Sequence, residues 1–176
     1  MKKQIIATLT ATTFVTITSS IGMSNSVTGA NVCNYYAGKA VNGESIYIDM
    51  CSISRESDRT VNFSYYLAQQ RIESQANCQS RTWTSLSDRT SHSPQSQATK
   101  NMLQIVCTAP SSNPGIVIGV VFDPPSYIRK SPNGKVICAI KELRAIELNG
   151  GITPDGWLFT PTCGGGVIHK SQIRFN

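Results

Sequence analysis

Six cysteines set the strongest constraint on how this chain of 176 residues can fold. An even number of cysteines, without the closely spaced C-x-x-C pairs of zinc ribbons and redox enzymes, is typical of disulfide-bonded exported proteins. We therefore expect three disulfides and no metal site. Among the alternative connectivities we favour the sequential one, because each pair then falls within one segment of the chain. The expected pairs are Cys33 with Cys51, Cys78 with Cys107, and Cys138 with Cys163.

Residues 1–30 have the pattern of a secretory signal peptide. Lys2 and Lys3 precede an apolar, threonine-rich stretch from Ile5 to Ile21, and a polar segment follows. The apolar stretch is shorter and more polar than the roughly 20 apolar residues of a membrane span. We therefore expect a cleaved signal and no membrane span in the mature chain. The sequence leaves open whether the exported protein is periplasmic or extracellular.

The composition excludes two broad classes of protein. The net charge is +6, and without the two leader lysines it falls to 14 − 10 = +4, which does not indicate a nucleic-acid-binding protein. With 40% hydrophobic and 15% charged residues, the chain also lacks the composition of a disordered protein. A folded globular protein is expected.

The segment 108–115 contains two prolines, a glycine and small polar residues, which are typical of a linker. We place the linker at residues 111–115. The mature chain then divides into a domain of residues 31–110 and a domain of residues 116–176. Neither domain has enough excess charge to indicate an electrostatic partner.

The first domain contains signals for a hairpin, further strands and one helix. The pair Asn42-Gly43 predicts a tight turn because it accepts positive φ angles. Alternating residues predict strands at 45–54 and 60–67. A helix is predicted from Pro94 to Val106, with Ser93 as its N-terminal cap. We therefore predict a disulfide-bonded α+β domain.

The second domain has no helical periodicity. Short strand signals separated by Pro, Gly, Asn and Asp predict six strands, at 116–122, 127–129, 136–140, 145–148, 157–160 and 167–169. Many short strands in about 60 residues favour a small closed β-barrel. The predicted fold is thus an α+β domain followed by an all-β barrel.

Five parts of the second domain form a pattern that can be compared with known families. They are Tyr127–Ile137, Ile140, Ile146–Leu148, Gly156–Leu158 and Gly166–Ile173. In these segments the domain resembles the bacterial Src-homology-3-like (SH3b) domain. Two positions depart from the family pattern, because Val167 stands where the family commonly has Trp and Leu143 where it usually has Gly. The resemblance implies a small SH3-like barrel. It also implies a recognition module, often associated with peptidoglycan or with other proteins, and it does not imply catalysis.

A shorter pattern in the first domain consists of residues 46–55, the predicted strand Val61–Leu67 and Ala76–Cys78. In these segments the domain resembles the bacterial surface-adhesin E-like group. This resemblance favours a surface or interaction protein.

Five residues of the second domain are candidates for a binding site. They are Tyr127, Arg129, Trp157, Phe159 and His169. An aromatic side chain could contact a sugar or a peptide, but in a small barrel a residue such as Trp157 more often covers the core. For Tyr127 and Phe159 both interpretations stay open, since in each strand the neighbouring aliphatic residue takes the opposite face. His169 could bind a ligand or have a structural role.

Signals for an enzyme are weak. Six cysteines in three disulfides leave no free thiolate for a cysteine hydrolase, and there is no Gly-x-Ser-x-Gly nucleophile motif. A pair of carboxylates for glycoside hydrolysis cannot be identified among ten scattered acidic residues. No cofactor motif is present.

The sequence thus predicts an exported, non-enzymatic recognition protein that binds a cell-wall polymer or a protein surface through its SH3-like module. The alternatives are an envelope hydrolase with an SH3-like targeting domain, and a secreted inhibitor or structural surface protein.

Overall fold

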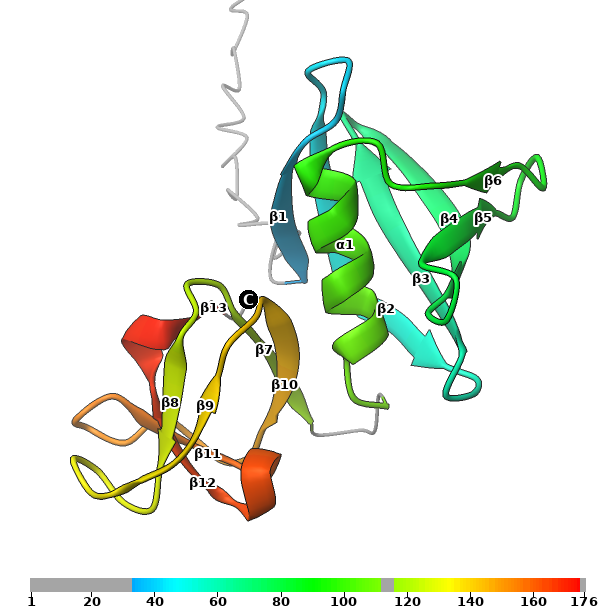
Figure 1. Ribbon diagram of the computed structural model, residues 1–176. Helices are drawn as coiled ribbons and strands as arrows, with labels where there is room; N and C mark the ends of the chain where they lie inside the picture. Colours follow the sequence, from blue (N-terminus) through cyan, green and yellow to red (C-terminus); the bar gives the residue numbers. More distant parts are fainter. Residues whose placement is uncertain (1–32, 112–115, 175–176) are drawn as a thin grey trace, which may run out of the picture.

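The computed structural model describes residues 33–111 and 116–174 (Figure 1). The predicted signal peptide and most of the predicted linker lie outside these residues. Two groups of strands lie beside each other, and the α-helix of the described chain lies on the side of the N-terminal sheet that faces the C-terminal strands (Figure 1).

The N-terminal sheet is an antiparallel meander in which each strand pairs with the next one along the chain. Its six strands are β1 (Asn34–Lys39), β2 (Ser45–Arg55), β3 (Thr60–Leu67), β4 (Gln70–Asn77), β5 (Thr82–Ser85) and β6 (Ser91–His92). The predicted turn joins β1 to β2, and Gly43 adopts a φ of 86° there. Helix α1 (Gln97–Thr108) packs across one face of the sheet and buries Met102, Ile105 and Val106 against it.

Seven short strands in the C-terminal half form two further sheets. A three-stranded sheet has the order β10 (Arg144–Leu148), β7 (Val117–Val121), β13 (Ile173–Arg174). A four-stranded sheet has the order β11 (Trp157–Thr160), β12 (Gly166–His169), β8 (Ser126–Arg129), β9 (Val136–Ile140). Two short 3-10 helices, η1 (Thr162–Gly164) and η2 (Lys170–Gln172), flank β12.

The predicted fold class, an α+β domain followed by a closed SH3-like barrel, is wrong. The described chain is mostly β, and none of its three sheets closes into a barrel. In the C-terminal half the strand positions are close to the predicted ones, but the ladders do not form a ring. Asn149 and Phe159 form one isolated bridge between the ends of β10 and β11, and the pairing stops after that single residue pair. In the N-terminal half the polar segment Gln70–Asn77 adds a strand that the sequence did not indicate.

The two halves share a hydrophobic core. Val120 of β7 and Ala145 of β10 pack into the cluster formed by the N-terminal sheet and α1. Their neighbours Val121 and Ile146 pack into a second cluster inside the C-terminal half. Because adjacent residues of a strand point to opposite faces, the three-stranded sheet separates the two clusters and contributes to both. The hydroxyl of Thr108, at the end of α1, accepts a hydrogen bond from the backbone N–H of Ala145 at 3.0 Å.

The three disulfides confirm the sequential pairing. They join Cys33 to Cys51, Cys78 to Cys107, and Cys138 to Cys163. The first connects the residue before β1 to β2, the second the end of β4 to α1, and the third β9 to η1. Three disulfides indicate an exported protein. No helix among the described residues is long and apolar enough to cross a membrane.

Candidate functional site

The five predicted site residues lie on one face of the four-stranded sheet. In the ladders Trp157 is opposite His169, Phe159 is opposite Val167, and Val167 is opposite Arg129. Directly paired residues share a face of a sheet, and residues two apart in a strand do as well. Tyr127 therefore joins Arg129 on this face.

The opposite face of the same sheet points into the second hydrophobic cluster. Ile128, Leu158 and Ile168, which alternate with the predicted site residues, are 0%, 3% and 0% exposed. The inner face is therefore fixed by core packing, and the outer face is left to solvent. We call the outer face the C-terminal face.

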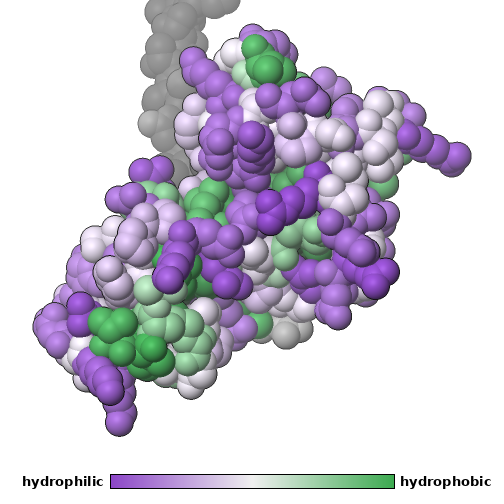
Figure 2. All heavy atoms as spheres, in the orientation of Figure 1, coloured by the Kyte–Doolittle hydropathy of each residue, from purple (hydrophilic) through white to green (hydrophobic). Residues whose placement is uncertain are grey.

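Large apolar side chains are exposed on the C-terminal face. Tyr127 is 41% exposed and Phe159 is 49% exposed, and Val136 of β9 is also exposed. Val136 pairs with Arg129, next to an irregularity in the ladder between β8 and β9. Figure 2 shows a hydrophobic area over the C-terminal half of the molecule. Contiguous exposed apolar side chains of this kind mark interaction surfaces.

Trp157 and His169 lie at the end of this face and are packed against each other. Trp157 is only 6% exposed, and its ring centroid is 5.2 Å from that of His169 in an edge-on arrangement. The ring nitrogens of His169 are 2.8 Å from the hydroxyl of Ser171 and 3.2 Å from the carbonyl oxygen of Asp155. Both side chains therefore hold the neighbouring turns in place.

Arg129 combines a structural contact with a position at the centre of the C-terminal face. Its Nη1 donates a hydrogen bond of 2.8 Å to the carbonyl oxygen of Gly134 in the turn between β8 and β9. The guanidinium group is half-buried among apolar neighbours, and Val167 and Val136 are its cross-strand partners. This arrangement suits noncovalent contact with another molecule.

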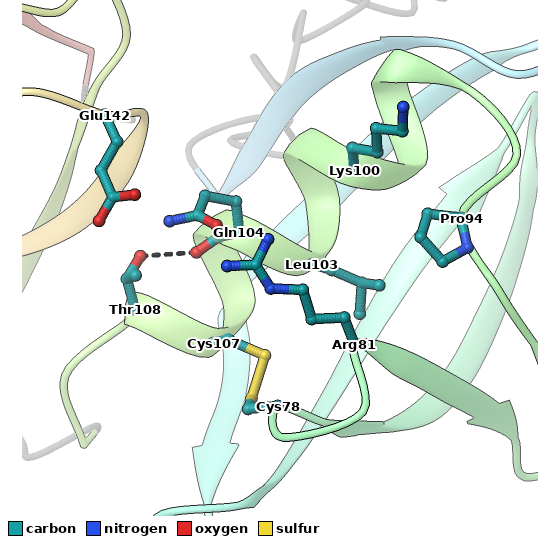
Figure 3. A pocket seen from close by; sticks show the side chains of 9 residues that line it. All are labelled: Cys78, Arg81, Pro94, Lys100, Leu103, Gln104, Cys107, Thr108 and Glu142. Atoms are coloured by element: carbon teal, nitrogen blue, oxygen red, sulfur yellow. Dashed lines mark hydrogen bonds between the residues drawn. A yellow bond between two sulfur atoms is a disulfide. The ribbon is translucent and has the colours of Figure 1, made fainter.

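A cavity of about 430 Å³ lies between α1 and the C-terminal half (Figure 3). Its charged lining residues are Arg81, Lys100 and Glu142, and none of them forms an ion pair among the described residues. The volume is within the range of small-ligand sites. Sequence reasoning missed this cavity because its lining comes from the turn after β4, the segment before α1, α1 itself and the loop after β9, which are distant in the sequence.

Titrating groups with shifted pKa values lie in the N-terminal half. Burial raises the pKa of Tyr35 and of Tyr65 above the usual value for tyrosine. The backbone N–H of Thr90 donates to Asp88 in a turn and lowers the pKa of that carboxyl group. These shifts have structural causes, burial and a turn hydrogen bond.

The described residues bring one group of potential metal ligands together, formed by Cys33, Asp49 and Cys51. The two sulfur atoms are bonded to each other in a disulfide, so neither is available as a thiolate ligand. The group is therefore not a metal centre in this oxidation state.

Comparisons with protein-family models, with curated proteins and with solved structures find no match for this chain.

Proposed function

We propose that this chain is an exported binding protein that acts through noncovalent contacts of its C-terminal face. The observation that supports this function is the exposure of Tyr127, Phe159 and Val136 together on one face of a sheet whose other face packs into the second hydrophobic cluster. Exposed aromatic and aliphatic side chains around an arginine are typical of the centre of a protein interface.

A protein surface fits this face better than a polysaccharide. Val136 and Val167 offer apolar area but no hydrogen-bonding group, and both are cross-strand partners of Arg129. A sugar chain needs polar partners for its hydroxyl groups, whereas a protein interface gains free energy from apolar area alone. A cell-wall polymer is the second candidate, because Tyr127 and Phe159 present exposed aromatic rings.

The experiment places a photoreactive benzoyl-phenylalanine at position 159 of the full chain in the producing cell. We expect a discrete protein adduct that is lost when Val136→Asp is added. The matched control carries the same photoreactive group at position 41, an exposed valine in the turn between β1 and β2. No adduct from position 159, or the same adduct from both positions, would contradict the proposal.

Co-sedimentation with purified peptidoglycan tests the second candidate. If the wild-type protein co-sediments with peptidoglycan and Phe159→Ala does not, the ligand of the C-terminal face is the wall polymer and not a protein surface.

A further inference from the structure

A row of tyrosines crosses the outer face of the N-terminal sheet. In the ladders Tyr36 of β1 is opposite Tyr47 of β2, Tyr47 is opposite Tyr66 of β3, and Tyr66 is opposite Arg71 of β4. Directly paired residues share a face, so these four side chains lie side by side across four strands. With neighbouring strands about 4.8 Å apart, the row is about 14 Å long.

The rings of this row are accessible. Tyr36 and Tyr47 are both exposed, and their ring centroids are 5.2 Å apart at an interplanar angle of 48°. Helix α1 packs on the other face of the sheet, where Ile46 and Ile48 are buried. The outer face, which we call the N-terminal face, is therefore uncovered among the described residues.

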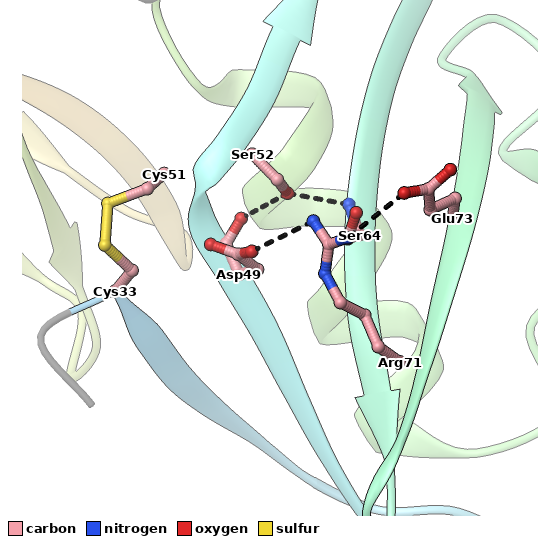
Figure 4. A network of polar contacts seen from close by, with 7 residues as sticks. All are labelled: Cys33, Asp49, Cys51, Ser52, Ser64, Arg71 and Glu73. Carbon is pink, nitrogen blue, oxygen red and sulfur yellow. Dashed lines mark hydrogen bonds and ion pairs between the residues drawn. A yellow bond between two sulfur atoms is a disulfide. The ribbon is translucent and has the colours of Figure 1, made fainter. Parts of the chain in front are cut away.

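Polar groups surround the tyrosines. One step along the strands, Asp49 is opposite Ser64 and Ser64 is opposite Glu73. Arg71 lies between the two carboxylates, 3.5 Å from Asp49 and 3.0 Å from Glu73 (Figure 4). One guanidinium and two carboxylates leave this part of the face without excess positive charge.

Amide side chains extend the polar surface. The amide nitrogen of Gln75 donates to the side-chain oxygen of Asn62 at 3.0 Å and to Glu56 at 3.3 Å. At the far end of the row, a hollow of about 400 Å³ is lined by Arg71, Glu73 and Leu86, among others. The face thus offers donors and acceptors along one side of the aromatic row and at its Arg71 end.

We propose that the N-terminal face binds an uncharged glycan chain. The carbon-hydrogen faces of sugar rings stack on tyrosine, and sugar hydroxyl groups pair with carboxylate, amide and guanidinium groups such as Asp49, Gln75 and Arg71. The absence of excess positive charge disfavours an acidic polymer or a nucleic acid. Within β1–β4 the exposed large hydrophobic residues are Tyr36 and Tyr47 alone, so the aliphatic centre of a protein interface is missing.

This binding site is independent of the C-terminal face. It differs from that face in chemistry, because its aromatic rings are flanked by hydrogen-bonding groups instead of valines. Sequence reasoning missed it because the four residues come from four different strands, and only the strand register brings them together.

Affinity electrophoresis of the full chain tests the proposal. Native gels contain a neutral glucan (hydroxyethylcellulose), a neutral galactomannan or an anionic polygalacturonate. We expect retardation by a neutral polysaccharide that persists at high salt, and about tenfold weaker binding in Tyr47→Ala, the size of the loss expected when an aromatic stacking contact is removed. Co-sedimentation with peptidoglycan then shows whether the bacterial wall is a source of the glycan.

Matched variants separate binding from folding. Tyr47→Phe keeps the ring and should retain most of the affinity. If Tyr47→Ala does not fold, Tyr36→Ala on the edge strand replaces it as the test, and this variant should also bind more weakly. The control is Ile152→Ala, which removes an exposed side chain from the loop between β10 and β11 and should leave glycan binding unchanged. The proposal is overturned by wild-type protein that binds neither neutral polysaccharide nor peptidoglycan, by retardation with polygalacturonate alone, or by equal losses in Tyr47→Ala and Ile152→Ala.

Discussion

Neighbouring residues in the strands of the C-terminal half have opposite environments. Leu158 is buried in the second cluster, whereas Phe159 beside it is exposed. The alternation of side chains in a strand allowed either residue to face the core, and the sequence left the choice open. The choice depends on which face of the sheet meets the three-stranded sheet, and that is a property of the tertiary structure. Individual site residues could therefore be named from sequence, but their exposure could not.

Trp157 and Phe159 share a face and differ in burial, which predicts different effects on stability. We expect Trp157→Ala to lower the free energy of unfolding by about 3–5 kcal/mol, because it removes a buried ring and leaves a cavity. Phe159→Ala should change it by less than about 1 kcal/mol, since its ring is half exposed. Urea denaturation of both variants measures the difference. Equal losses would show that the burial assigned to Trp157 is wrong.

Helix α1 begins three residues later than the sequence indicated. The pair Ser93-Pro94 is a common helix start, but the observed cap is Ser96. The hydroxyl of Ser96 accepts from the N–H of Thr99, and the hydroxyl of Thr99 accepts from the N–H of Ser96. Threonine takes the role that Glu or Gln has in the usual capping box, so the motif was not recognised.

The position of the cap can be tested by a pair of serine substitutions. Ser96→Ala should lower the free energy of unfolding by about 1 kcal/mol, the usual cost of losing an N-terminal cap. Ser93→Ala should have little effect, because the helix does not begin there. Chemical denaturation monitored by circular dichroism compares the two. A larger loss of unfolding free energy in Ser93→Ala than in Ser96→Ala would show that Ser93 caps the helix, as the sequence predicts.

Strand positions were easier to predict than strand pairing. Periodic apolar residues place β3 at Thr60–Leu67, and the same reasoning locates β9 at Val136–Ile140. Strand β4 was missed because Gln70–Asn77 is mostly polar and shows little apolar alternation. Pairing depends on contacts between distant residues, such as Ile173 with Val121, which no local pattern encodes. The prediction of a closed barrel was wrong because it depended on strand pairing and not on strand position.

At the scale of the whole molecule, the shared core makes the halves depend on each other. We expect residues 116–176 expressed alone, with their disulfide intact, not to fold stably, because Val120 and Ala145 would lose the partners that bury them. The measurement is a proton–nitrogen correlation spectrum, which should show poor dispersion for the fragment and good dispersion for the full chain. A well-dispersed spectrum of the fragment would mean that the C-terminal half is an autonomous domain.

Each disulfide joins a cysteine to the next one along the chain. When a chain enters an oxidising compartment from its N-terminal end, Cys51 arrives while Cys33 is the only earlier thiol in the sequence. If each pair is oxidised before the next cysteine arrives, the order of arrival alone produces the native connectivity. A chain refolded from the fully reduced state meets all six thiols at once and has to exchange incorrect pairs. The direction of export therefore supplies information that refolding in solution lacks.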